Sequence, residues 1–284
     1  MKRSIVSIIA AGLVVLSLMA LASCQQVKIS KGLAYTVDGN ECTVTGIGDC
    51  TDTDLVIPQK IDGYPVTSIA KEAFDRNENI RSVVVPSGVK NIGDYCFASC
   101  TSLESVYLPG SINEMGRGAF SECGRLNSIT LENGIQAIGD MTFSDCVSLT
   151  SIHIPSSVVS IGKTAFNACT SLEKVDFEKG VREIGDGAFM SCSGMKTLEM
   201  PKSVESIGVK AFKDCTSLED VMIPKGISKI GVGAFEGCTS LEKIKFERES
   251  DWIAGGVDVN ELQDASKAAE LLTVTHADKM WERK

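Results

Sequence analysis

The 284-residue chain has few of the side chains that most often carry out catalysis or bind nucleic acid. It contains two histidines, His153 and His276, and no recognisable motif places a nucleophile or a carboxylate beside either one. Acidic residues outnumber basic ones by 37 to 28, which gives a formal charge of −9 at pH 7. This charge disfavours nucleic acid and anionic membranes as partners, because both are negatively charged. The composition therefore argues against an enzyme and a nucleic-acid partner. No bound metal is expected either, because the spacing of the acidic residues matches no calcium loop.

Aromatic residues are also scarce, at 6% of the chain, but their distribution is regular. Eight of the ten phenylalanines recur every 23 residues without an insertion or deletion. A fixed period between 20 and 50 residues indicates a repeat solenoid, in which each unit stacks only on its neighbours. A solenoid is usually a binding surface rather than an enclosed catalytic pocket. The phenylalanine column consists of Phe74, Phe97, Phe120, Phe143, Phe166, Phe189, Phe212 and Phe235.

Other positions of the repeat are equally regular. Isoleucine or methionine lies five residues before the phenylalanine, glycine usually follows it, and cysteine lies three residues after the phenylalanine in seven units. Alternating residues such as Val106 and Leu108 predict one short strand in each unit. We expect the glycine at a corner that needs a positive φ or close backbone approach. We also expect a turn of helix, as at residues 163–167, that folds the phenylalanine inward. Since the glycines recur at these corners, there is no glycine-rich phosphate loop, and no cofactor is expected.

The repeated string Cys-Thr-Ser-Leu-Glu precedes a strand that often ends in proline, and Val-x-x-Ile-Gly-x-x-Ala-Phe follows. This pattern resembles the BspA-type leucine-rich repeat family of bacterial surface proteins. The resemblance extends over eight units, residues 66–247, and implies a β-rich, right-handed leucine-rich-repeat solenoid with short strands and a helical turn in each unit. The general leucine-rich pattern has asparagine or cysteine where this chain has Gly88, Ser111 and their equivalents, so the usual asparagine ladder is missing.

Both ends depart from the 23-residue period, as expected for a solenoid whose terminal units need capping. Residues 33–65 contain strand-like runs and resemble the β cap that precedes the repeats in the same family. Beyond residue 247, Ala265, Ala268 and Leu272 are spaced for one face of a short helix that could cover the last unit. We divide the chain into a signal peptide (1–23), a tether (24–32), an N-terminal cap (33–65), the solenoid (66–247), and a C-terminal helical cap and tail (248–284).

The N-terminal segment has the form of an export signal. Lys2 and Arg3 precede a mainly apolar run over residues 5–21, which is typical of a secretory signal peptide. The run ends in Leu-Ala-Ser-Cys at Cys24, which resembles the lipobox of bacterial lipoproteins. This resemblance implies cleavage before Cys24 and attachment of several acyl chains, which would anchor the chain stably. An ordinary signal peptide and an uncleaved transmembrane helix are the alternatives. Without Lys2 and Arg3 the chain has 26 basic and 37 acidic residues, a formal charge of −11.

Eleven cysteines in an exported chain would usually suggest disulfides. Seven of them share one column, where the side chains are parallel and their Cβ atoms are about 4.8 Å apart, the spacing of neighbouring strands. A disulfide needs Cβ atoms roughly 3.5–4.5 Å apart. We expect these seven to be buried, reduced thiols. Cys42 and Cys50 lie in the N-terminal cap, where the sequence is compatible with either a disulfide or two free thiols.

The outward-facing strand positions vary along the repeat while the core positions do not, so a ligand would be recognised there. In the first four units these positions are uncharged, and in the last four they are mostly charged. We expect Tyr107 to act as an anchor, because a solvent-facing aromatic residue among small residues can dominate binding. An unconstrained solvated face would also vary. The candidate binding residues are Ser82, Val84, Ser105, Tyr107, Ser128, Thr130, Ser151 and His153.

Taken together, these features predict a monomeric, lipid-anchored protein of the bacterial cell envelope, at the outer membrane or cell surface. The family resemblance implies that its solenoid mediates protein or cell adhesion through an extracellular protein or glycan. One alternative is a carbohydrate-binding envelope module, which a row of exposed aromatic residues would favour. The other is a structural envelope protein without a dedicated ligand, which an exposed face without apolar residues would favour.

Overall fold

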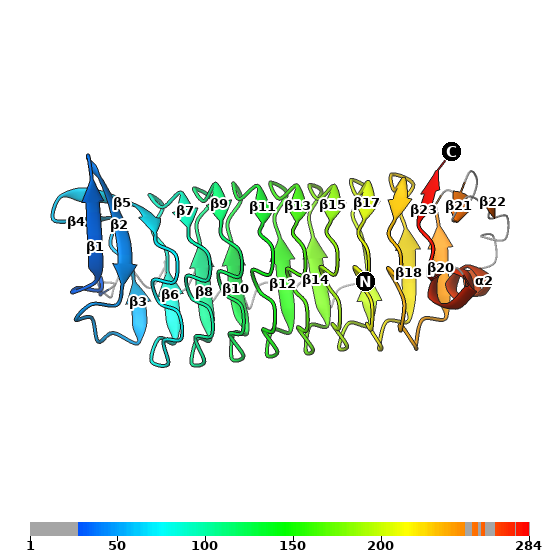
Figure 1. Ribbon diagram of the computed structural model, residues 1–284, viewed down its shortest axis with the longest axis horizontal. Helices are drawn as coiled ribbons and strands as arrows, with labels where there is room; N and C mark the ends of the chain where they lie inside the picture. The colour runs from blue at the N-terminus through cyan, green and yellow to red at the C-terminus, as the bar shows by residue number, and fades with distance from the viewer. Residues whose placement is uncertain (1–27, 248–251, 255–256, 259–264, 276, 284) are drawn as a thin grey trace, which may run out of the picture.

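The protein is a straight β-solenoid of about nine turns, seen side-on in Figure 1. The computed structural model describes residues 28–247, 252–254, 257–258, 265–275 and 277–283. In most units a two-residue strand lies on one wall and a longer strand on another, and the turn that joins the first to the second carries the phenylalanine. The units are stacked along the long axis, with the N-terminal cap at one end and α2 near the other (Figure 1).

The longer strands form three successive sheets, and within each sheet they pair in parallel and in register at the repeat spacing. Strands β6 (Ser82–Val84), β8 (Ser105–Leu108) and β10 (Ser128–Leu131) are neighbours in one sheet. In β8, Val106 and Leu108 are buried and Tyr107 is half-buried, which confirms the predicted alternation. On the same wall, β12 (Ser151–Ile154) and β14 (Lys174–Phe177) form the second sheet. The third sheet consists of β16 (Thr197–Leu198), which is shortened to two residues, β18 (Asp220–Ile223) and β20 (Lys243–Phe246).

A second wall is formed by two-residue strands, each ending in the isoleucine or methionine of the repeat. They pair in parallel from unit to unit except between residues 114–115 and 137–138, and that apolar residue is buried in every case. These strands are β7 (Asn91–Ile92), β9 (Glu114–Met115), β11 (Ala137–Ile138), β13 (Ser160–Ile161), β15 (Glu183–Ile184), β17 (Ser206–Ile207) and β19 (Lys229–Ile230).

The eight phenylalanines of the repeat form one continuous stack inside the solenoid. All are buried, and neighbouring rings are stacked with centroids 4.7–5.7 Å apart and interplanar angles of 2–21°. These separations lie in the range that aromatic pairs prefer. A single unit is too small to bury its own phenylalanine, so the stack joins each unit to the next.

The seven repeated cysteines lie beside this stack with a specific role. Each thiol donates a hydrogen bond to the backbone carbonyl of a phenylalanine in the preceding unit, at 3.1–3.3 Å. Burial raises the pKa of the Cys169 thiol to about 12. The ten cysteines among the described residues are free thiols, including Cys42 and Cys50 in the N-terminal cap.

The turn that carries the phenylalanine is not helical, so the prediction of one helical turn per unit is wrong. In a central unit, Thr164 and Ala168 on either side of Phe166 adopt left-handed conformations with φ of 49° and 57°. The N–H groups of these three residues donate to carbonyls of the following unit, at 2.7–2.8 Å. Hydrogen bonds between units therefore replace the i→i−4 bonds of a helix, and they explain why residues other than glycine tolerate a positive φ.

The glycine that follows the isoleucine is required by close packing rather than by a positive φ. A Cβ atom added at Gly162 would lie 2.6 Å from the backbone nitrogen of Asp140 and 2.6 Å from the carbonyl carbon of Gly139. The backbone of the preceding unit leaves no room for a side chain at this corner. Of the two explanations offered by the sequence, close approach is the correct one.

The N-terminal cap is built from strands that join both walls. Strand β2 (Glu41–Gly46) pairs with β1 (Ala34–Asp38) and with β5 (Tyr64–Ile69), β4 (Lys60–Ile61) folds back on β5, and β3 (Asp54–Val56) pairs with β6. Ser30 is only 2% exposed. Its N–H donates to the carbonyl of Val56 at 3.0 Å, and its hydroxyl accepts from the Val56 N–H at 3.1 Å.

The C-terminal end is closed mainly by strands, so the helical cap is not supported in the predicted form. Strand β23 (Trp281–Arg283) pairs antiparallel with β19 and with β21 (Trp252–Ala254), which pairs with β22 (Val257–Asp258). The helical part is limited to α2 (Ala265–Glu270) and the π-helix η2 (Leu271–Thr275), beside β20. A strand suits this position because β23 pairs with the otherwise open hydrogen-bonding edge of β19.

Candidate functional site

The structure places the eight candidate residues on the exposed side of the longer strands, which we call the strand face. One in-register column across neighbouring strands consists of Ser82, Ser105 and Ser128. A second column, two residues further along each strand, consists of Val84, Tyr107 and Thr130. Ser151 and His153 lie on β12, which adjoins β10. None of the eight is buried.

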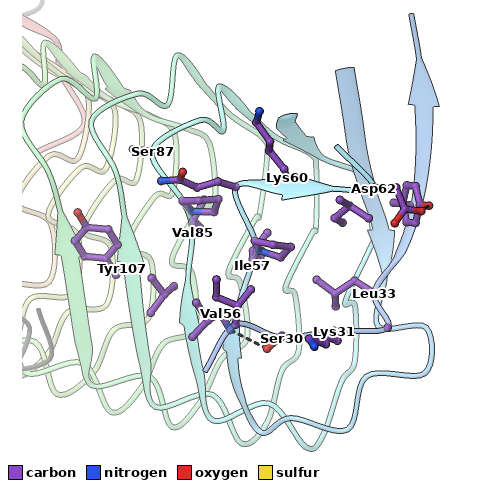
Figure 2. Close-up of a pocket in the computed structure, with 18 residues that line it drawn as sticks. Ser30, Lys31, Leu33, Val56, Ile57, Lys60, Asp62, Val85, Ser87 and Tyr107 are labelled. Atoms are coloured by element: carbon purple, nitrogen blue, oxygen red, sulfur yellow. Dashed lines mark hydrogen bonds between the residues drawn. The ribbon is translucent and has the colours of Figure 1, made fainter. Parts of the chain in front are cut away.

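A groove of about 940 Å³ lies at the N-terminal end of the strand face, where the cap meets the first units (Figure 2). Of the eight candidate residues, Val84 and Tyr107 line the groove. Its volume is near the upper end of the range for small-molecule sites, about 300–1,000 Å³. The other lining residues come from segments 29–33, 56–62 and 85–87 and from Tyr35.

The floor of the groove is apolar because the strand face begins with an apolar column. Val56 of β3 pairs with Val84 of β6, which pairs in turn with Tyr107 of β8. All three side chains are half-buried. Pro58 and Pro86, which follow these strands, also line the groove. An apolar, partly exposed column of this kind favours contact with the flat face of a ligand.

Two tyrosines that line the groove are each held by a carboxylate. The hydroxyl of Tyr107 donates to Glu132, and the hydroxyl of Tyr35 donates to Asp62. Burial and then the bond to Glu132 raise the pKa of Tyr107, and the bond to Asp62 raises the pKa of Tyr35. Both phenols are therefore neutral at physiological pH. Their rings are held in fixed orientations at the edge of the groove.

Glu132 is itself positioned by the repeat. It occupies a repeat position where most units have proline. Its carboxylate accepts a hydrogen bond from the Gly110 N–H at 3.3 Å. Glu178 occupies the same column and accepts the Ser156 N–H at 2.8 Å. Hydrogen bonds from Ser156 hold the pKa of Glu178 below its ordinary value. Glu132 and Glu178 therefore link neighbouring units, and Glu178 remains ionised.

His153 lies between two carboxylates, which the search for motifs along the sequence did not find. Its Nδ1 is 3.1 Å from Asp176 Oδ2, and its Nε2 is 3.5 Å from Glu178 Oε1. The repeat could have revealed the first contact, because Asp176 follows His153 by one period. The two ring nitrogens face different carboxylates and so do not converge on one point. Across the described residues, no group of three or more His, Cys, Asp or Glu residues is arranged to hold a metal ion.

The cap side of the groove was missed by sequence reasoning. Leu33, Tyr35, Lys60 and Asp62 all line it, but the cap has no 23-residue period from which to infer where they lie. One signal was available, since Val56 extends the exposed column of Val84 into the cap. Cys24 lies outside the described residues. No helix within those residues has the length and apolar character needed to span a membrane.

Comparison with known proteins identifies the repeat. The family model described as "BspA type Leucine rich repeat region (6 copies)" matches residues 67–155 and 136–255. No curated protein shows significant similarity to the chain. The chain is similar to the crystal structure of a Treponema pallidum leucine-rich repeat protein, with 30% identity over 75% of this chain and 91% of that one, at a TM-score of 0.58. A leucine-rich repeat protein from Eubacterium ventriosum has 20% identity over 72% of this chain and 50% of that one, at a TM-score of 0.52.

Proposed function

This chain belongs to the BspA-type leucine-rich repeat family, and we propose that it is a lipid-anchored surface protein that mediates adhesion through its solenoid. The family is one of bacterial surface proteins. The proposed anchor is the lipid at Cys24, after export directed by residues 1–23. The proposed binding region is the N-terminal half of the strand face, including the groove.

The groove is the observation that carries this proposal. It lies where the sequence predicts a binding surface, and Tyr107, the expected anchor, lines it. A purely structural envelope protein has no need of a concave site with an apolar floor and fixed aromatic walls. The two half-buried valines of the floor are also difficult to explain on a face that only contacts water, because burying them would be favourable.

The anchor is tested by replacing Cys24 with alanine in the full chain. We expect Cys24→Ala to abolish incorporation of labelled palmitate and to move the protein from the membrane fraction to the soluble fraction. The matched control is Cys96→Ala, which introduces the residue that most other units have at that position, as at Ala119 and Ala165. Equal palmitate incorporation in wild type and Cys24→Ala would refute lipidation at this residue.

Adhesion is tested by displaying the full chain on cells that do not normally attach to host surfaces. We expect display to increase attachment to epithelial cells or to immobilised matrix proteins and mucin. Tyr107→Ala should reduce that attachment at least tenfold while the surface level of the protein stays unchanged. If cells that display the protein attach no better than cells without it, the result would favour a structural envelope protein without a dedicated ligand.

A further inference from the structure

We propose that the groove binds a neutral oligosaccharide, with sugar rings resting against Tyr107 and Tyr35 and along the apolar floor between the cap and β8. This inference rests on the proposed surface function and names the ligand of the same site. Tyr107 lies at one end of the groove, and Asp62, which binds the hydroxyl of Tyr35, lies at the other (Figure 2). A ligand that contacts both tyrosines therefore has to extend along the groove from one end to the other.

The lining combines the two kinds of surface that a sugar ring presents. A pyranose ring has a face of C–H groups and a rim of hydroxyl groups, so it needs a flat apolar contact surrounded by hydrogen-bonding groups. Val56, Val84 and Tyr107 supply the apolar contact. An aliphatic or lipid ligand would use this floor but would leave the polar lining without partners, at a cost for each group removed from water. The polar side chains that line the groove are Ser30, Lys31, Gln59, Lys60, Asp62 and Ser87.

Both tyrosines are held in place before a ligand arrives. Each hydroxyl is bound to a carboxylate, and Glu132 is also fixed by the Gly110 N–H. An ionised carboxylate has about four lone-pair sites, so Asp62 and Glu132 can still accept hydrogen bonds from ligand hydroxyls. Fixed side chains lose little conformational entropy on binding. The groove therefore offers aromatic faces with hydrogen-bond acceptors already beside them.

The charges around the groove favour an uncharged ligand. Lys31 and Lys60 line it and are exposed, and they are opposed by Asp62 and by Glu132 beside Tyr107. The lining itself has two positive groups and one negative group, and Glu132, bound to the Tyr107 hydroxyl, brings the local formal charge to zero. Sugar hydroxyls both donate and accept, so they can use the lysines and the carboxylates together. An acidic glycan would have to lie against two carboxylates.

The test begins with the full chain in detergent applied to an array of neutral and acidic oligosaccharides and of matrix proteins. We expect the strongest signal from a neutral oligosaccharide, whose dissociation constant is then measured by calorimetry. Tyr107→Ala and Tyr35→Ala should each weaken binding at least tenfold, and Tyr107→Phe should weaken it less because the ring remains. Met222→Ala is the matched control, since Met222 is an exposed apolar residue in the same strand column far from the groove.

The possible outcomes separate this inference from the proposed function. If displayed cells attach but only matrix proteins or acidic glycans bind on the array, adhesion stands and the neutral-oligosaccharide assignment is wrong. If a neutral oligosaccharide binds but the tyrosine variants match Met222→Ala, the ligand is bound elsewhere and the groove assignment is wrong. Thermal unfolding of each variant by circular dichroism shows whether a loss of binding reflects a loss of folding.

Discussion

Replacing Phe166 with alanine tests how the units hold together. Phe166 is completely buried, and its ring is stacked between Phe143, with centroids 5.5 Å apart, and Phe189, at 5.1 Å. Truncating a buried phenylalanine costs about 3–5 kcal/mol. Because this change removes two stacked contacts, each worth about 0.5–1.5 kcal/mol, we expect a loss near the upper end of that range. Phe74 is stacked on Phe97 alone among the repeat phenylalanines, so Phe74→Ala should cost about 1 kcal/mol less.

The assay is urea unfolding of the full chain in detergent, followed by far-ultraviolet circular dichroism. With an m-value of about 2–3 kcal/mol/M, a loss of about 4 kcal/mol lowers the midpoint by roughly 1.3–2 M. Met222→Ala is the control, because Met222 is 43% exposed and surface substitutions usually change stability by less than about 0.5 kcal/mol. An unchanged midpoint for Phe166→Ala, or an equal fall for Met222→Ala, would show that the phenylalanine stack does not stabilise the solenoid.

Further predictions concern the glycine corner and the buried thiols. Gly162→Ala should destabilise the chain by about 1–3 kcal/mol, because the new Cβ meets backbone atoms; an unchanged melting temperature would show that the units can move apart. With its pKa raised from 9.0 to about 12, Cys169 should react with a thiol reagent at pH 8 about a thousandfold more slowly in the native state than in urea, and disulfides mapped between units would contradict this. Since unfolding exposes the Cys169 thiol, its contribution to stability should be complete below about pH 9 and lost as the pH rises towards 12, by about 1.4 kcal/mol per pH unit; equal pH dependence of stability between pH 9 and 11 in wild type and Cys169→Ala would exclude it.

The regular part of the fold could be predicted because each unit repeats the same physical problem. A buried phenylalanine every 23 residues forces neighbouring units into register, and register then fixes which strand residues are exposed. The alternation of Val106 with Tyr107 and the burial of the cysteine column follow from that spacing. The same spacing placed the candidate residues on one face, although it could not show whether they bind anything.

The turns and the groove could not be predicted, for two different physical reasons. Residues such as Tyr95, Thr164 and Ala168 rarely adopt a left-handed conformation on local grounds, and only hydrogen bonds to the next unit stabilise it here. The groove depends on where an aperiodic cap meets a periodic array. Tyr35 and Asp62 are brought to the strand face by the path of the cap chain, which no single repeat column encodes.

The burial of Ser30 has a consequence for how the molecule would stand on a membrane. With Ser30 and Lys28 already bound to the cap, only residues 25–27 separate the fold from the proposed lipid at Cys24. Four residue steps span at most about 14 Å, so the cap would be held close to the bilayer while the eight units extend roughly 38 Å along the array. The groove would then open near the base of the molecule. A thin, flexible polymer could reach it there, whereas a large globular partner would meet the membrane first.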